Sequence, residues 1–124
     1  MTRSAFILSA DTLRYLHEHP DRHDQLWWID NDADNACGTT RCIAGTICHL
    51  AGLHWTDTAH VISSDGIRRS VPHAAAQLVD MEWRTAIAIF YEPDEVRAVE
   101  LFELHAASLG ATHTRSLAQT LETV

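Results

Sequence analysis

Three cysteines close together are the residues of this chain with the clearest potential for chemistry. Cys37, Cys42 and Cys48 lie within one short stretch, and His49 follows directly. Cys37 precedes a predicted helix N-terminus, where exposed backbone N–H groups and the helix dipole would stabilise a thiolate. One hypothesis is therefore that the chain is a thiol-dependent protein. Under this hypothesis, Cys37 and Cys42 form a redox pair or supply a nucleophile assisted by a histidine such as His49.

The alternative is that these thiols are small buried hydrophobic side chains, a frequent role of free cysteine. The Cys-x5-Arg loop of thiol phosphatases would need arginine at position 43, where this chain has Ile43. A reactive cysteine needs an exposed, electropositive setting, which the sequence does not demonstrate. An odd number of cysteines without a secretion signal also argues against a disulfide framework. We therefore favour reduced thiols that serve as packing material.

Metal binding by the same cysteine–histidine cluster is a further hypothesis, because zinc prefers these ligands. The spacing fits poorly, since Cys42 and His49 are seven residues apart and two turns distant on one helix face. The acidic run at residues 30–35 resembles the first half of a calcium loop, but Asn35 replaces the glycine and Arg41 the bidentate glutamate. We expect a solvated loop there, and neither a metal nor another cofactor.

Protein binding is the function class that composition favours. The net charge is −8, with 17 acidic residues against 9 basic ones, so nucleic-acid binding is disfavoured. No apolar run approaches the ~20 residues that span a bilayer, and no signal peptide is recognisable, so we expect a cytoplasmic protein. Trp27, Trp28 and Trp55 could form an aromatic anchor patch, although they could equally lie in the core. The leading hypothesis is a non-enzymatic module whose partner is another protein.

A helix rich in small residues is the element expected to position the cysteines, running from Cys37 to Gly52. Thr39 or Thr40 can act as its N-cap, and Gly52 can close it in the left-handed conformation. Small residues along one face would let another element approach closely, which compensates for the cost of about 1 kcal/mol of a mid-helix glycine. The residues with an expected structural role are Gly38, Thr39, Gly45 and Gly52.

The remaining pattern predicts helices at residues 9–20, 73–79, 81–91 and 93–109, and a β-hairpin at residues 60–71 with Asp-Gly in its turn. Ser9 and Asp80 are the expected caps of the first and third of these helices, and Gly110 is expected to end the last. In the helix at 81–91 we expect the buried side to carry Trp83, Ala86, Ile87 and Phe90.

These elements fit a single domain over residues 1–124, with 112–124 as a weak helix or a frayed tail. The predicted fold class is mainly α, a compact orthogonal bundle of about five helices with one small β-hairpin. His105 is expected to be a core histidine satisfied by one hydrogen bond. The helix-turn-helix outline of residues 72–90 is too apolar for a DNA groove, so we interpret it as ordinary helix packing.

The cysteine-rich stretch resembles a family of small uncharacterised proteins from actinobacteria and their phages. The specific motif is Cys-Gly-Thr-x-x-Cys-x-Ala-Gly, which begins at Cys37. Other stretches that resemble the family are His19-Pro20, Trp28, Ala75-Ala76-Gln77-Leu78 and Leu101-Phe102. This chain departs from the family in its acidic run at residues 30–35 and in Thr46, where an aromatic is expected. The resemblance implies a host class and a shared scaffold, and it implies no activity.

Overall fold

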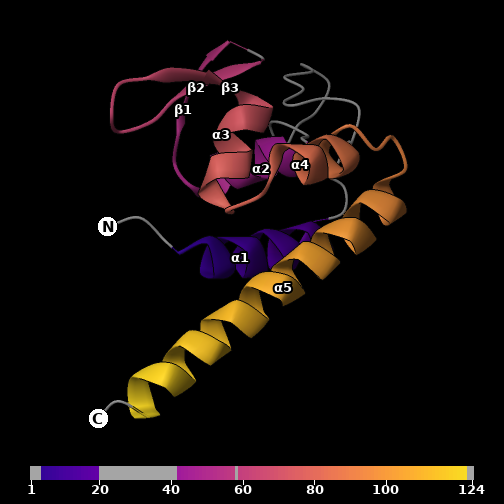
Figure 1. The fold of residues 1–124 in the computed structure, drawn as a ribbon. Helices are drawn as coiled ribbons and strands as arrows, with labels where there is room; N and C mark the ends of the chain where they lie inside the picture. Colours follow the sequence, from indigo (N-terminus) through magenta and orange to yellow (C-terminus); the bar gives the residue numbers. More distant parts are fainter. Residues whose placement is uncertain (1–3, 20–41, 58, 123–124) are drawn as a thin grey trace.

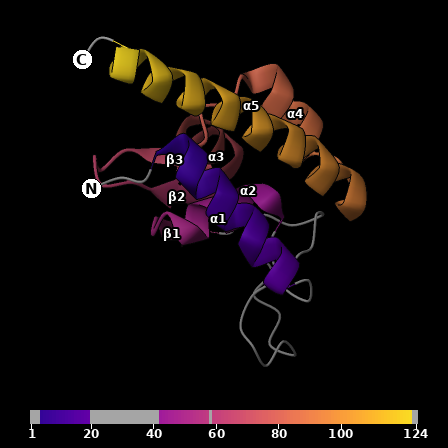
Figure 2. The same ribbon diagram turned by 90° about the horizontal axis from the view of Figure 1, so that it is seen from below.

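Five helices and a small three-stranded sheet make up the part of the chain that the computed structural model describes, residues 4–19, 42–57 and 59–122, with side chains in the last helix as far as residue 111. The helices are α1 (Ala5–Glu18), α2 (Ile43–Leu50), α3 (Val71–Leu78), α4 (Trp83–Phe90) and α5 (Glu95–Glu122). The strands are β1 (His54–Asp57), β2 (His60–Ile62) and β3 (Arg68–Ser70). The predicted mainly α class with a small hairpin is therefore confirmed. In Figures 1 and 2, α1 and α5 lie on one side of α2, and α3 and the sheet lie on the other.

Helix α2 is the centre of the fold, because its residues 43–48 are all buried. It packs against α3, α1 and α4, so little of its surface is left for solvent. The helix is shorter than the predicted 37–52. It begins at Ile43, and its N-cap is Cys42 in place of the expected Thr39 or Thr40, which lie outside the described residues. Gly52 closes the helix with a φ of +78°, as predicted.

Helix α1 begins earlier than the sequence pattern indicated. Its N-cap is Ser4, whose side chain accepts a hydrogen bond from the N–H of Ile7 at 3.2 Å. The expected cap, Ser9, instead lies fully buried inside the helix. Both serines suit an N-cap by residue type, and tertiary burial decides between them.

The sheet is antiparallel with the order β1-β2-β3, and the predicted hairpin is its β2–β3 half. Gly66 takes a φ of +77° in the turn, which explains the Asp-Gly pair. Strand β1 was not predicted, and it pairs with β2 so that Trp55 faces Val61. Arg69 of β3 faces Val61 from the other side, so these three side chains share the inner face of the sheet.

The turn between α3 and α4 contains the one described non-glycine residue with positive φ. Asp80, at φ +54°, ends α3 rather than capping α4, whose N-cap is Glu82. The buried side of α4 consists of Ala86, Ile89 and Phe90. The prediction that Trp83 and Ile87 are buried is wrong, because they are 39% and 45% exposed.

Helix α5 continues through Gly110, which was expected to end it, and residues 112–122 extend it to Glu122. A Cβ at Gly110 would lie 3.0 Å from the ring of Phe6, so the glycine allows α5 to approach α1 closely. His105 is half-buried, and its Nε2 lies 2.8 Å from the carbonyl oxygen of Val79. The expected single hydrogen bond of this histidine is therefore present.

Candidate functional site

Cys42 and Cys48, the two described cysteines, are both fully buried. The Cys42 Sγ accepts a hydrogen bond from the N–H of Gly45 at 3.5 Å, so this thiol caps α2. The Cys48 Sγ donates to the carbonyl oxygen of Val71 at 3.7 Å. Burial, with a smaller contribution from Cys42, raises the pKa of Cys48 to about 12. These settings suit packing rather than reactivity. Cys37 lies outside the described residues.

His49, the third candidate of the cysteine cluster, is exposed near the end of α2. Its ring centroid lies 6.2 Å from that of Tyr15, in a tilted arrangement. Within the described part of the chain, no group of three or more histidine, cysteine, aspartate and glutamate side chains is arranged to hold a metal ion.

The predicted aromatic patch cannot be assembled from the described residues, because Trp27 and Trp28 lie outside them. Trp55 is half-buried and packs against the core from the inner face of the sheet. Trp83, which the sequence pattern placed in the core, is the more exposed of the two described tryptophans.

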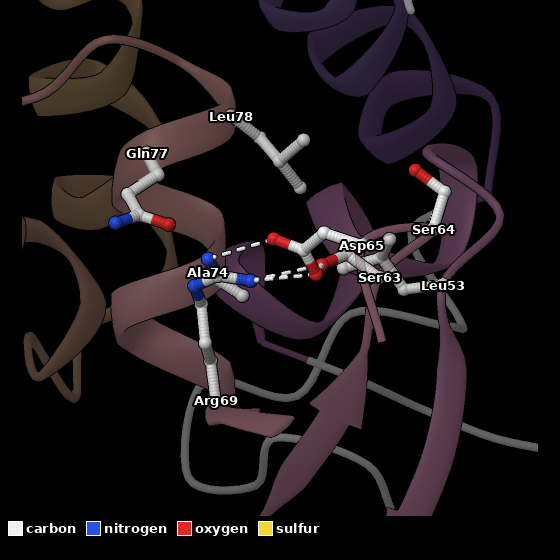
Figure 3. A pocket seen from close by; sticks show the side chains of 8 residues that line it. All are labelled: Leu53, Ser63, Ser64, Asp65, Arg69, Ala74, Gln77 and Leu78. Atoms are coloured by element: carbon white, nitrogen blue, oxygen red, sulfur yellow. Dashed lines mark hydrogen bonds and ion pairs between the residues drawn. The ribbon is translucent and has the colours of Figure 1, made fainter. Parts of the chain in front are cut away.

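A hollow of about 230 Å³ lies beside the β2–β3 turn (Figure 3), and its lining mixes apolar side chains with a charged network. Arg69 bonds both carboxylate oxygens of Asp65, at 2.9 and 3.3 Å, and donates to Ser63 at 2.8 Å. Arg69, Ser63 and the N–H of Ile67 hold the pKa of Asp65 well below its ordinary range. The charges compensate each other within the network, so it holds the turn in place.

A second hollow of about 630 Å³ adjoins the first and shares four of its lining residues: Leu53, Ser63, Ser64 and Leu78. It extends to Leu8 of α1 and to Gly52 and His54 after α2. No cysteine lines either hollow. Ser63, Ser64 and His54 do line them, but among the described residues no hydrogen bond joins either serine to His54. The serines and the histidine are therefore not arranged as a nucleophile and its base.

Two polar pairs on the sheet and on α3 resemble parts of catalytic sites. Ser70 lies within hydrogen-bond distance of His73 Nδ1, and the His73 ring stacks on Trp83 with centroids 4.0 Å apart. Ser70 is also the N-cap of α3, with His73 three residues later, which is the spacing of a capping box. Among the described residues no carboxylate bonds the other ring nitrogen of His73, so a catalytic triad is not formed.

The second pair consists of Asp57 and His60, whose Oδ1 and Nδ1 lie 2.9 Å apart. Arg68 bonds the other oxygen of Asp57, so the carboxylate ties β1, β2 and β3 together. The N–H of Ala59, His60 and Arg68 lower the pKa of Asp57 to about 2. This carboxylate therefore stays charged at neutral pH, and its role is to hold the sheet together.

Exposed apolar side chains gather instead on α4 and α5. A hollow of about 450 Å³ lies between the two helices, and Leu104 in its lining is 68% exposed. We call this region the α4–α5 face and define it by Ala88, Leu101 and Leu104, which line the hollow. Trp83 and Ile87 are also exposed on α4, but they do not line the hollow, and the Trp83 ring stacks on His73 of α3. Sequence reasoning missed it because α4 is apolar on nearly every side, and periodicity alone does not show which side meets the core.

Comparison with protein-family models, with curated proteins and with solved structures finds no match. None of the described helices combines the length and the apolar character that crossing a membrane requires.

Proposed function

We propose that this chain is a small non-enzymatic protein-interaction module that binds its partner through the α4–α5 face. One observation carries the proposal: the large apolar side chain of Leu104 remains 68% exposed at the hollow between α4 and α5. Ala88 and Leu101 also line this hollow. An exposed apolar patch with a hollow marks a site of protein contact.

The buried thiols support the non-enzymatic part of the proposal. A thiol nucleophile must be exposed and ionised, and the raised pKa of Cys48 opposes ionisation. The net charge of −8 supports a protein partner over a nucleic acid. The proposed location is the cytoplasm. A source in actinobacteria or their phages is proposed on the resemblance of the motif that begins at Cys37.

Site-specific photo-crosslinking in the cells that produce the protein tests this function. A photoreactive amino acid replaces Ala88 or Leu104, which are exposed and line the hollow. The matched control replaces Ile67, which is 53% exposed but lies beside the β2–β3 turn. We expect an adduct of defined mass from positions 88 and 104 and none from position 67. Equal labelling at all three positions, or no adduct at 88 and 104, would overturn the proposal.

A further inference from the structure

The two adjoining hollows beside the β2–β3 turn form a second candidate site. We call them together the β2–β3 hollow and define it by the residues that line both parts, Leu53, Ser63, Ser64 and Leu78. Its larger part, about 630 Å³, lies within the range of about 300–1,000 Å³ that small-molecule sites occupy. The β2–β3 hollow therefore has enough space for a small molecule.

Aliphatic side chains make up most of its wall. Leu50, Leu53, Ile62 and Leu78 are each half-buried, and Leu8 is only 1% exposed, so the hollow reaches down to the core. Figure 3 shows Leu78 pointing from α3 toward the β2–β3 turn. No phenylalanine, tyrosine or tryptophan is among the described residues that line the hollow. The wall therefore suits an aliphatic ligand, which would bury these side chains, better than a flat aromatic ring, which gains by packing against other rings.

The charges that line the β2–β3 hollow cancel each other. Apart from His54, its described lining includes two charged side chains, Asp65 and Arg69, which bond each other at 2.9 and 3.3 Å. A charged ligand would give up its bonds to water and would find the opposite charge already paired, which costs free energy. The lining therefore favours a neutral ligand.

Polar side chains at the hollow are available for hydrogen bonds. Ser64, Gln77 and His54 are exposed, and their side chains form no hydrogen bond with the other described residues. Ser63 differs, because its hydroxyl already donates to Asp65 and accepts from Arg69. The hydroxyl of Ser64 and the amide of Gln77 both donate and accept hydrogen bonds. A ligand with one hydroxyl, ester or amide group would satisfy them.

From these observations we infer that the β2–β3 hollow binds a small neutral aliphatic molecule that carries a hydroxyl, ester or amide group. The aliphatic part lies against Leu53 and Leu78, and the polar group faces Ser64 or Gln77. This inference is independent of protein binding by the α4–α5 face, because the β2–β3 hollow shares no lining residue with the hollow between α4 and α5.

Amide chemical shifts of the full chain, measured by NMR, test the inference. The probe is 1-octanol, and octanoate and octylammonium carry a negative and a positive charge on the same aliphatic chain. Leu78→Trp fills the hollow. Its matched control is Leu101→Trp, which replaces another half-buried leucine that lines the hollow between α4 and α5. The dispersion of the amide signals establishes that each variant folds. Ser64→Trp, in the exposed turn, narrows the β2–β3 hollow if Leu78→Trp does not fold.

We expect 1-octanol to shift the amide signals of Leu53, Ser64 and Leu78 until they saturate, with half-saturation at or below about 1 mM, and to leave Leu104 unchanged. Leu78→Trp should weaken binding at least about tenfold and Leu101→Trp should not, and both charged probes should bind at least about tenfold more weakly than 1-octanol. Shifts that do not saturate, equal shifts at Leu104, or equal binding of a charged probe would overturn the inference. Crosslinks at positions 88 and 104 test the proposed function separately, so either claim can fail alone.

Discussion

Ser9 is the described residue whose side chain is most poorly satisfied. It is fully buried, and its Oγ has no hydrogen-bond partner. Thr12, one turn later and equally buried, instead donates its hydroxyl to the carbonyl oxygen of Leu8 at 2.8 Å. A buried hydroxyl without a partner costs free energy, because it gave up its bonds to water.

Ser9→Ala should therefore stabilise the protein by about 1 kcal/mol, since it removes the unpaired hydroxyl and introduces a better helix former. Ser4→Ala is the matched control in the same helix. It should cost about 1 kcal/mol, because the bond from Ser4 to the N–H of Ile7 is lost. Urea unfolding measures both. A loss of stability in Ser9→Ala would show that the hydroxyl has an ordered partner.

The thiols of Cys42 and Cys48 provide a test against the thiol-dependent alternative. In a Cys37→Ser background they are the two cysteines that remain of the three in the chain. Because both are fully buried, and because Cys48 has a pKa of about 12, a thiol reagent at pH 8 should modify them only as fast as the protein unfolds. Denaturant should then release two reactive thiols. If either thiol reacts in the folded protein at the rate of free cysteine, the thiol-dependent alternative is supported instead.

At the scale of elements, α2 and α3 end in the same way. The N–H groups of Gly52 and Leu53 bond the carbonyl oxygens of His49 and Cys48, which is a Schellman motif. The N–H groups of Asp80 and Met81 bond Gln77 and Ala76 in the same pattern. The left-handed position is glycine in one motif and aspartate in the other.

Substitutions at these two left-handed positions should change the free energy of unfolding in opposite directions. Asp80→Gly should raise it by about 0.5 kcal/mol, because glycine takes a positive φ without strain. The greater entropy of glycine in the unfolded chain offsets part of the gain. Gly52→Ala should lose about 1 kcal/mol for conformational reasons alone, since a Cβ at Gly52 meets nothing within 4 Å. Thermal unfolding of both variants measures this. A loss in Asp80→Gly would mean that the aspartate side chain stabilises the turn.

The elements also show what local sequence could predict. Alternation and turn residues located the β2–β3 hairpin, and glycine at position 52 marked the end of α2, because these signals depend on local backbone geometry. The prediction that Gly110 ends α5 was wrong because this glycine serves a long-range contact and not a local backbone conformation. Its lack of a side chain serves the contact with Phe6, more than a hundred residues away in the chain. The exposed side of α4 was missed likewise, since only the packing of α4 on α3 and α5 selects which apolar residues are buried.

For the whole molecule, the balance of charge sets the dependence of stability on pH. The net charge is −8 and the sequence pI about 5.4, so lowering the pH from 7 toward 5 reduces repulsion within the folded chain. At lower pH the protonation of Asp57 has the opposite effect and decreases the stability of the folded chain. Its folded pKa is about 2, below the ordinary value of 3.8, so its contribution is present above 3.8 and is lost as the pH falls through about 2. Asp65 adds to this loss, because its pKa is also lowered.

We therefore expect the melting temperature to be highest near pH ~5 and to fall steeply between pH ~4 and ~2. Asp57→Asn should melt at a lower temperature at pH 5 to 7, because Arg68 and His60 lose their anionic partner. It should fall less than the wild type below pH ~4, so that the two curves converge in acid. Circular dichroism melts over this range measure both. Coincident curves would mean that the carboxylate of Asp57 adds nothing to the stability of the sheet. Parallel curves that stay displaced in acid would mean that its contribution does not come from its charge.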